Sequence, residues 1–355
     1  MNLQFIGFVK AQCRSANHML EVPDPPLELA WTPTQVEQLE GLSAGGDLYI
    51  KRDDTTAGPA QGNKIRKLEY ELGSALEADA DVVVTGGGIQ SNHCRATALL
   101  ASRLGLETHL VLLGDPPRDP GGNYLLSTLV ADRTQTLPES EFSGWEHALD
   151  AAATQERALE RNPYVVPIGA STPRGALGYV RAYGEIAAWM RDCGVEPDRI
   201  VVPTGSAGTQ AGLLAASLAD DGPAVTGIDV TPYGRRYQEE TVQELVEGIY
   251  RQLETNAPAP GTIEAAVDVR SGYVGPGYAS PAEADLETIA TVARQSGIVL
   301  DPTYTGKAFR ACLDMVDAGE ECLFVHTGGS YGLFPHSTAV HEAAERMSDR
   351  TEDPS

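Results

Sequence analysis

One lysine of this sequence stands in a setting that favours a reactive amine. Lys64 follows Gly62 and Asn63 at the expected start of a helix, and Arg66 and Lys67 lie within the next turn. A helix N-terminus and nearby cations both disfavour the protonated ammonium, and the neutral amine is the form that attacks an aldehyde to give a Schiff base. A solvated cation on a helix surface is the alternative for this residue.

Three glycine-rich segments follow expected strands. They are Thr85-Gly86-Gly87-Gly88 before Ile89-Gln90-Ser91-Asn92-His93, then Thr204-Gly205-Ser206-Ala207-Gly208-Thr209, and His326-Thr327-Gly328-Gly329-Ser330. Glycine lets the chain turn sharply and approach a ligand, and the helix that follows offers free N–H groups to an anion. The second segment is a candidate phosphate loop. A tight turn between strand and helix is the alternative for each segment.

The sequence lacks the common nucleotide-binding motifs. No segment fits G-x-x-x-x-G-K-[ST], and no G-x-G-x-x-G follows a strand with a suitably placed acidic residue downstream. These absences disfavour a nucleotide site.

Strands and helices must alternate to position these segments. From residue 80 onward, short β-branched runs are followed by glycine and then by helical periodicity, which predicts an α/β fold of parallel sheets flanked by helices. Ligands in such folds bind at the carboxyl edge of the sheet, where the glycine-rich segments would lie. The expected strands are 81–85, 109–113, 164–168, 200–203, 225–230, 298–300 and 323–326.

One helix start is expected in detail. Ser280 would be the N-cap, Pro281 the first helical residue and Glu283 the residue that closes a capping box. We expect this helix to have a structural role.

Length and composition indicate a soluble protein of two domains. The chain of 355 residues exceeds the ~100–200 residues usual for one domain, and its hydrophobic content of 42% is ordinary. No apolar run approaches the ~18–20 residues that span a bilayer, and the first residues lack the basic segment and cleavage site of a secretion signal. We therefore expect a cytoplasmic protein.

The chain is strongly acidic. Fifty acidic residues against 26 basic ones give a net charge of -24, which disfavours nucleic acid and anionic membranes as partners and leaves small molecules. Few of the basic residues are lysines, a balance that resembles proteins from high-salt cytoplasm, with an ordinary acidic bacterial enzyme as the alternative. The cysteines are far apart and form no C-x-x-C pair, so we expect free thiols and no metal site. They are Cys13, Cys94, Cys193, Cys312 and Cys322.

Taken in order, the segments of this chain resemble the family of D-cysteine desulfhydrase and 1-aminocyclopropane-1-carboxylate (ACC) deaminase. These are pyridoxal 5'-phosphate (PLP) enzymes of fold type II, with two open, twisted, mostly parallel sheets. The resemblance covers nearly the whole chain, although about the first 25 residues match nothing and Gly58-Pro59-Ala60-Gln61 departs from the family. The matching segments are Leu29-Ala-Trp-Thr-Pro-Thr-Gln35, Tyr49-Ile-Lys-Arg-Asp-Asp54, Gly62-Asn-Lys-Ile-Arg-Lys-Leu-Glu69, Gln90-Ser-Asn-His93, Gly175-Ala-Leu-Gly-Tyr179, Gly275-Pro-Gly-Tyr278, Asp301-Pro-Thr-Tyr-Thr-Gly-Lys307 and His326-Thr-Gly-Gly329.

The resemblance implies a domain organisation. Residues 26–72 and 181–355 would form a large PLP-binding domain, residues 73–180 a small inserted domain, and residues 1–25 an N-terminal extension. Closure of the small domain would bring Ser91 over the cofactor and exclude water. The family also implies a homodimer.

The resemblance further implies roles for residues in two of the motifs. Lys64 would bind the cofactor covalently, and Asn92 would form a hydrogen bond to its phenolic oxygen. Ser91, Asn92 and His93 would hold the substrate carboxylate, which a helix N-terminus favours through its dipole and its free N–H groups. Ser91 is counted with Lys64 among the expected catalytic residues.

The remaining roles fall to the C-terminal half of the chain. The segment from Thr204 to Thr209 corresponds to the phosphate loop, and Thr327 would lie at the pyridine nitrogen. Tyr278 and Tyr304 match two catalytic tyrosines that face the substrate, where they would assist proton transfer to the leaving group. Packing with an outward hydroxyl is the alternative for Tyr278.

The implied reaction is elimination from the β-carbon of a small sulfur-containing amino acid. PLP withdraws electrons, Lys64 moves the α-proton, and D-cysteine would give pyruvate, sulfide and ammonia. Thr305 and Thr327 replace a glutamate and a leucine of ACC deaminases, which favours the desulfhydrase. ACC deaminase and L-cysteate sulfo-lyase are the alternatives within the fold, and a non-catalytic PLP- or nucleotide-binding protein is the alternative from another class.

Overall fold

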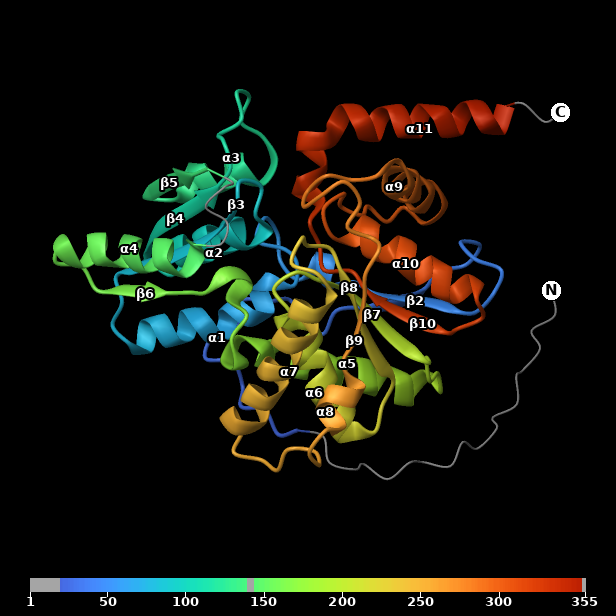
Figure 1. Cartoon of the computed structure of the whole chain (residues 1–355), viewed down its shortest axis with the longest axis horizontal. Helices are drawn as coiled ribbons and strands as arrows, with labels where there is room; N and C mark the ends of the chain where they lie inside the picture. The colour runs from blue at the N-terminus through green and yellow to red at the C-terminus, as the bar shows by residue number, and fades with distance from the viewer. Residues whose placement is uncertain (1–19, 139–143, 353–355) are drawn as a thin grey trace.

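The computed structural model describes residues 20–138 and 144–352, which form two β-sheets with helices on their faces (Figure 1). The strands of the larger sheet are β1 (Val36–Gln38), β2 (Leu48–Lys51), β7 (Arg199–Thr204), β8 (Ala224–Asp229), β9 (Asp268–Arg270) and β10 (Cys322–Val325). They lie in the order β1-β2-β10-β7-β8-β9. All neighbours in this sheet are parallel except β1 and β2.

The smaller sheet is wholly parallel and comes from the middle of the chain. Its strands are β3 (Val82–Gly88), β4 (Glu107–Leu113), β5 (Arg133–Leu137) and β6 (Pro163–Val165). They lie in the order β5-β4-β3-β6. The expected α/β class with two mostly parallel sheets is therefore confirmed. The division into residues 26–72 with 181–355 and residues 73–180 stays a prediction, and all four strands of the smaller sheet fall within the second of these ranges.

Helices connect the strands and cover both sheets. The α-helices are α1 (Lys64–Glu77), α2 (Asn92–Arg103), α3 (Gly122–Val130), α4 (Trp145–Ala158), α5 (Pro173–Cys193), α6 (Gly208–Asp220), α7 (Arg235–Gln252), α8 (Thr262–Ala266), α9 (Glu283–Ser296), α10 (Thr305–Asp317) and α11 (Ser337–Glu352). Short 3-10 helices are η1 (Asp53–Thr55), η3 (Ile168–Ala170) and η4 (Ser330–His336). Among the described residues, no helix has the length and apolar character needed to cross a bilayer.

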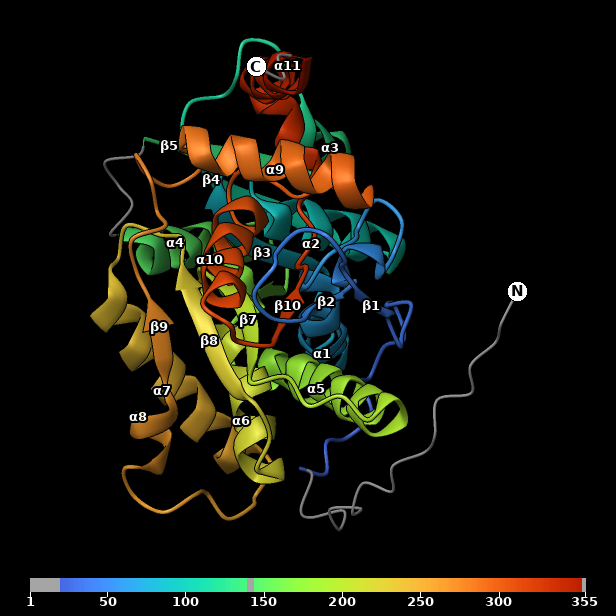
Figure 2. The same ribbon diagram turned by 90° about the vertical axis from the view of Figure 1, so that its right-hand side faces the viewer.

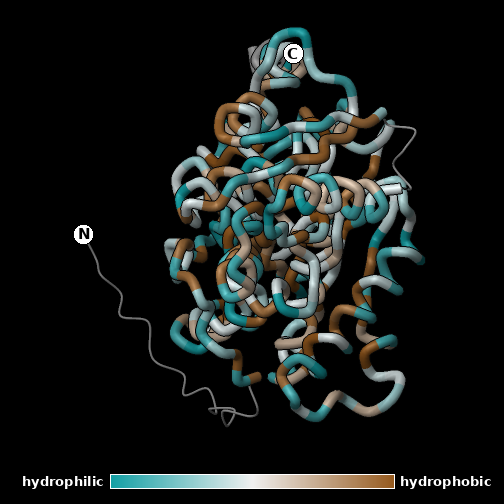
Figure 3. Tube along the Cα trace, turned by 90° about the vertical axis from the view of Figure 1, so that its left-hand side faces the viewer, coloured by the Kyte–Doolittle hydropathy of each residue, from teal (hydrophilic) through white to brown (hydrophobic). Residues whose placement is uncertain are grey.

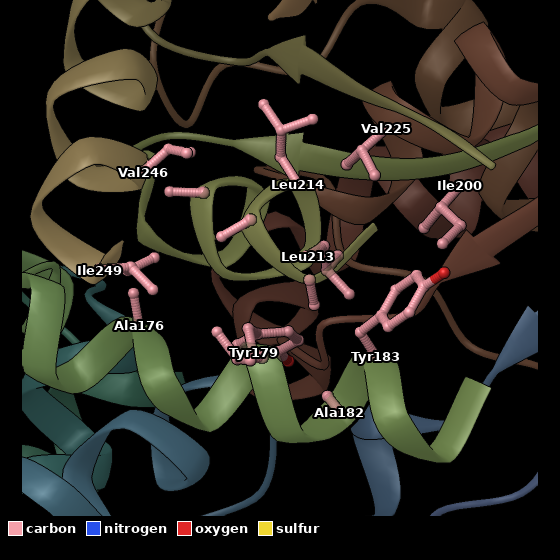
Figure 4. Packing of buried hydrophobic residues seen from close by; sticks show 14 of the residues in the cluster. Ala176, Tyr179, Ala182, Tyr183, Ile200, Leu213, Leu214, Val225, Val246 and Ile249 are labelled. Atoms are coloured by element: carbon pink, nitrogen blue, oxygen red, sulfur yellow. The ribbon is translucent and has the colours of Figure 1, made fainter. Parts of the chain in front are cut away.

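The larger sheet is buried on both faces because successive residues of its strands point in opposite directions. In β7, Ile200 packs with α5, α6 and α7, including Tyr183 and Leu213, as the close view in Figure 4 shows. The next residue, Val201, packs on the other face with α10. There the ring of Phe309 packs edge to face against the ring of Phe324 in β10. Figure 2 shows α5 and α10 on opposite sides of these strands, and Figure 3 shows the most hydrophobic segments inside the molecule.

Most expected strands are present, with shifted ends, but one is wrong. Residues 298–300 form no strand, although Ile298 and Leu300 are buried. Their apolar character comes from packing in the cluster beneath α10 rather than from strand pairing. Four strands that the sequence did not predict are β1, β2, β5 and β9.

The expected start of the helix near residue 280 is also wrong by two residues. Helix α9 begins at Glu283 with Ala282 as its N-cap, and Asp285 accepts the Ala282 N–H at 2.8 Å. Ser280 is instead part of a tight turn in which its N–H donates to Gly277 O at 3.2 Å. The turn therefore removes the serine that the sequence pattern favoured as the cap.

The described cysteines are free thiols. Cys94, Cys312 and Cys322 are buried, and Cys193 is exposed. Cys13 lies outside the described residues, as does most of the expected extension of residues 1–25.

Candidate active site

Lys64 is the first residue of α1. The side chain is partly buried and makes no hydrogen bond or ion pair with the described residues. Burial lowers the pKa of Lys64 to about 8. The sequence predicted a lowered pKa from nearby cations, whereas the cause in the structure is loss of solvation, and the neutral amine is favoured in both cases.

The residues before Lys64 contact two of the glycine-rich segments. The N–H of Asn63 donates to Thr327 O at 3.1 Å, and its side-chain Nδ2 donates to Thr209 Oγ1 at 2.9 Å. Gly62 has φ +108°, and a Cβ placed on it would lie 2.8 Å from Thr327 O, so this close approach requires glycine. These contacts place Lys64 between the expected phosphate loop and the segment that contains Thr327.

The expected phosphate loop ends at the N-terminus of α6, where first-turn N–H groups lack helical acceptors. Ala207 has φ +62°, a region that L-residues seldom adopt outside functional loops. The Gly205 carbonyl accepts from Gln238 Nε2 at 2.9 Å, which fixes the loop from α7. The Thr204 hydroxyl bonds to Gln210 at 2.8 Å, so Thr204 supports the turn through its side chain.

Lys67 lies behind this loop and was missed by the sequence analysis. Its ammonium donates to Gly169 O at 3.1 Å and to Ser171 Oγ at 2.9 Å. Ser171 in turn donates to Ser206 Oγ at 2.8 Å, and a Cβ placed on Gly208 would lie 2.8 Å from Lys67 Nζ. Burial, and then the charge of Lys64, lower the pKa of Lys67 well below its usual range, although an anion in the loop would favour its charged form.

The N-terminus of α2 carries the three residues expected to bind a carboxylate. Ser91 is the N-cap, and its Oγ accepts the Cys94 N–H at 3.1 Å. The imidazole of His93 contacts Thr85 Oγ1 at 2.8 Å, and burial lowers its pKa well below the usual range. The neutral ring therefore points into the small sheet, which leaves the backbone N–H of His93 for a ligand. Asn92 Oδ1 is buried without a hydrogen-bond partner.

Tyr278 and Tyr304 meet at their hydroxyl groups. The two oxygens form a short hydrogen bond, and the rings are edge to face with centroids 6.0 Å apart. A Cβ on Gly88 would lie 3.1 Å from Tyr278 Cε1, and a Cβ on Gly205 would lie 3.5 Å from Tyr304 Cε1. Burial raises the pKa of Tyr278 to about 12 and that of Tyr304 well above its usual range, so both are neutral proton donors at pH 7. Tyr278 therefore packs against the first glycine-rich segment and Tyr304 against the second.

Thr305 and Thr327 differ in how their hydroxyls are used. Thr305 Oγ1 donates to Asp301 Oδ1 and accepts the Asp301 N–H, both at 2.7 Å. The Asp301 carboxylate also accepts the N–H groups of Thr303 and Tyr304, so its charge is used at the start of α10. Thr327 is buried beside Asn63, and its hydroxyl has no hydrogen bond to a described residue.

These groups fit a phosphorylated aromatic aldehyde. An amine without a partner, Lys64, is available for the aldehyde carbon. The N-terminus of α6 and Lys67 are suited to a phosphate, and the amide of Asn92, whose buried Oδ1 has no hydrogen bond to a described residue, is free to bond a polar ligand. The donor set therefore agrees with the cofactor that the sequence resemblance implies, although the individual contacts stay predictions.

Comparisons with known proteins agree with this chemistry. Residues 27–328 match the family model described as "Pyridoxal-phosphate dependent enzyme". The chain is 37% identical over 329 residues to a putative ACC deaminase of Pyrococcus furiosus, covering 89% of this chain and 95% of that protein. It is 39% identical over 327 residues to a D-cysteine desulfhydrase of Klebsiella pneumoniae, covering 88% and 96%. A solved structure described as an ACC deaminase homologue superposes with a TM-score of 0.79 at 36% identity, covering 90% and 96% of the two chains.

Proposed function

Because the chain belongs to the family of pyridoxal-phosphate-dependent enzymes, we propose that it is a lyase that converts D-cysteine to pyruvate, sulfide and ammonia. The observation that carries this choice of substrate is the neutral hydroxyl of Thr327, which lies beside Asn63 in the segment that the resemblance assigns to the pyridine nitrogen. Thr305 is bound to Asp301 at 2.7 Å, and Thr327 offers a free hydroxyl beside the Lys64 segment.

PLP, when bound, supplies an electron-withdrawing ring that makes the α-proton of an amino acid acidic. The strength of this effect depends on what faces the pyridine nitrogen. A carboxylate would hold a proton there, as the glutamate of ACC deaminases is expected to do, whereas the hydroxyl of Thr327 is neutral. The weaker withdrawal is sufficient for loss of a thiol from the β-carbon and is insufficient for opening a cyclopropane ring.

Lys64 is the proton carrier in this proposal. Its pKa of about 8 leaves roughly a tenth of the amine neutral at pH 7, and this neutral fraction can take the α-proton. Lys67 and the N-terminus of α6 would hold the phosphate, which keeps the cofactor in register with Lys64. Lys67 also lies one helical turn from Lys64, so α1 fixes the position of both lysines relative to each other.

The substrate would be oriented from both ends. The N–H groups at the start of α2 would bind its carboxylate, with Ser91 Oγ at the same helix end. The hydroxyls of Tyr278 and Tyr304 would form hydrogen bonds that orient the departing sulfur and assist proton transfer to it, because burial raises both pKa values and keeps both groups protonated. Their mutual hydrogen bond would let one tyrosine replace the proton that the other gives up.

A substrate panel tests the proposal. The enzyme is incubated separately with D-cysteine, L-cysteine, β-chloro-alanine, L-cysteate and ACC, and pyruvate, 2-oxobutyrate, sulfide and sulfite are measured in each. We expect sulfide and pyruvate from D-cysteine and little 2-oxobutyrate from ACC. Efficient formation of 2-oxobutyrate from ACC, or more sulfite from L-cysteate than sulfide from cysteine, would overturn the choice of substrate.

Assembly and location belong to the same proposal. A homodimer in the cytoplasm is the arrangement that the sequence resemblance implies. Size-exclusion chromatography with light scattering tests the dimer, for which we expect twice the chain mass of 37.7 kDa.

A further inference from the structure

Arg95 is a buried cation that forms no ion pair with any acidic residue in the described part of the chain. It lies on α2, one turn after the residues expected to bind the substrate carboxylate, and its side chain is 0% exposed. Among the residues that the structure describes, its guanidinium bonds only to carbonyl oxygens and its Nε has no hydrogen-bond partner. A buried charge without a counter-charge costs free energy, so a gain in stability does not account for Arg95.

The guanidinium connects three segments that are far apart in the sequence. Its Nη1 donates to Pro59 O at 3.0 Å and its Nη2 to Gln61 O at 2.9 Å, in the loop that leads to Lys64. Its Cζ lies 4.9 Å from the centre of the Tyr331 ring, in η4. Because the guanidinium is planar, it can bond two carbonyls along its edge while its face lies on an aromatic ring.

Each connected segment carries one group of the site. Helix α2 begins beside Ser91, whose carbonyl accepts the Arg95 N–H at 3.2 Å. The loop of Pro59 and Gln61 continues through Asn63 into Lys64, and η4 follows the segment of Thr327. The Asn63 N–H, which donates to Thr327 O at 3.1 Å, connects two of these segments directly. The side chain of Arg95 thus links α2, where the substrate carboxylate is expected, to the loop that leads to Lys64.

We propose that Arg95 is a positioning residue that fixes the N-terminus of α2 relative to Lys64, and so sets the affinity for the carboxylate of the amino-acid substrate. This inference rests on the proposed function only in placing the substrate carboxylate at α2. It does not depend on which amino acid is the substrate. Arg95 acts through the backbone of the approach loop, since its guanidinium contacts Pro59 and Gln61 rather than Lys64 itself.

The variants are Arg95→Met, Arg95→Lys and Tyr331→Leu, with Arg103→Met as the matched control. Arg103 lies on the same helix and is exposed, so its removal takes a positive charge from α2 without touching the loop. Lysine keeps the charge at position 95 but cannot bond both carbonyls while stacked on Tyr331. Tyr331→Leu removes only the aromatic face and keeps Arg95.

Measurements of ligand binding, of stability and cofactor content, and of turnover separate a positioning role from a structural one. The first is the dissociation constant of alanine, followed through the cofactor absorbance, with whichever enantiomer binds the wild type. Alanine carries the carboxylate and amine but no leaving group. The second is the melting temperature of the cofactor-free protein, together with the amount of cofactor fixed to Lys64 by borohydride. KM and kcat are then measured with the best amino acid of the substrate panel.

We expect Arg95→Met to raise the dissociation constant of alanine and KM by about 10-fold or more, because small misplacements of a binding group are costly. The change in kcat should be smaller, cofactor fixation should stay stoichiometric, and the melting temperature should be unchanged or higher. Arg95→Lys and Tyr331→Leu should fall between Arg95→Met and the wild type, and Arg103→Met should match the wild type.

Two results would overturn the inference. One is a parallel fall of melting temperature and kcat in Arg95→Met with KM unchanged, which would make Arg95 a structural residue. The other is unchanged alanine binding in both Arg95→Met and Arg95→Lys. If Arg95→Met does not fold, the milder Arg95→Lys and Tyr331→Leu decide. A wild type that binds alanine but turns over no amino acid would overturn the proposed function alone.

Discussion

Two sets of buried cations lie on or beside α1, and the first set is fully paired. Arg66 bonds to Asp53 at 2.8 Å and to Glu185 at 2.7 Å, and Lys51 bonds to Glu185 at 2.7 Å. The Tyr179 hydroxyl donates to the same Asp53 at 2.6 Å. Burial alone would raise the pKa of Asp53, but Arg66 and Lys51 hold it well below its usual range.

The second set has no such partners. Lys64, Lys67 and Arg95 form no ion pair with any carboxylate in residues 20–138 and 144–352, and burial lowers the pKa of each. Arg66 lies between Lys64 and Lys67 in the sequence, so one turn of α1 carries both an ion-paired cation and two cations without an ion pair among the described residues. These three cations lie at or beside the segments expected to hold the cofactor and the substrate carboxylate, where a bound anion or a covalent bond would repay the lost solvation.

The largest expected effect comes from removing the central unpaired cation. Lys64→Ala should lower turnover by at least about 10³-fold, because no other described amine occupies its place to hold the cofactor or move the α-proton. Steady-state kinetics measure the loss, and borohydride labelling should show no fixed cofactor. The melting temperature of the cofactor-free variant should not fall. A variant with near-native activity would remove Lys64 from the site.

Removing the paired cation should instead damage the fold. Arg66→Met leaves Asp53 buried beside a single remaining cation, and breaking a buried pair in this way costs ~3–5 kcal/mol. Urea unfolding of the cofactor-free protein measures the change. The double variant Asp53→Asn/Arg66→Met should recover part of the loss, because the isolated carboxylate is gone. A single-variant cost below about 1 kcal/mol would show that the two sets do not differ as described.

Lys67 tests the comparison at the phosphate loop. Lys67→Met should raise the dissociation constant for PLP about 10–100-fold, since a charge-assisted bond near the phosphate is lost. Fluorescence titration of the cofactor-free protein measures this constant. The free energy of unfolding without cofactor should stay the same or rise, in contrast to Arg66→Met. A lower stability with unchanged PLP affinity would assign Lys67 to the structural set.

The pH dependence of stability should distinguish the two sets more finely. Between pH ~8 and ~10.4, Lys64 is largely neutral in the folded protein but still protonated in the unfolded chain. The unfolded state therefore binds more protons, and the Lys64 contribution to stability rises with pH across this window. Urea unfolding of the cofactor-free wild type and the cofactor-free Lys64→Met variant at pH 7 to 11 should show the difference between their free energies of unfolding shrinking as pH rises. A constant difference would contradict a lowered pKa at Lys64.

Salt should have the smallest effect on the comparison. With a net charge of -24, the acidic side chains on the surface repel one another. Molar salt screens this repulsion but has little effect on buried ion pairs. We expect the melting temperature of both wild type and Arg66→Met to rise by a few degrees in molar KCl, with the gap between them preserved. An unchanged or lower melting temperature would count against the high-salt interpretation of the composition.

The sequence predicted the features of the site that depend on local pattern. A strand, a glycine-rich turn and a helix start recur around Asn92, Gly208 and Thr327, and the fold class follows from their alternation. The family resemblance implied that Lys64 and two of these loops share one cofactor site, and the bonds of Asn63 to Thr327 and Thr209 show that these segments lie together in the structure. The same local reasoning failed at Ser280, where a turn takes the residue that would have capped the helix.

The rest depends on partners that are distant in the sequence. Lys67 is recognisable only through Gly169 and Ser171, about a hundred positions later. The role of Arg95 requires knowing that the loop of Gln61 and the ring of Tyr331 lie beside it. Even so, the spacing of Lys64 and Lys67, one helical turn apart, is a signal that a sequence analysis can use.

The strand order of the larger sheet has a consequence for the time course of synthesis. β10 lies between β2 and β7, and Cys322 pairs with Leu48, so the last strand of the chain is inserted into the middle of a sheet whose other strands are made earlier. Until that insertion, β2 and β7 present open edges that invite pairing with other chains. Because Thr327 comes just after β10, the bond between Thr327 and Asn63, beside Lys64, can form only after β10 has been made.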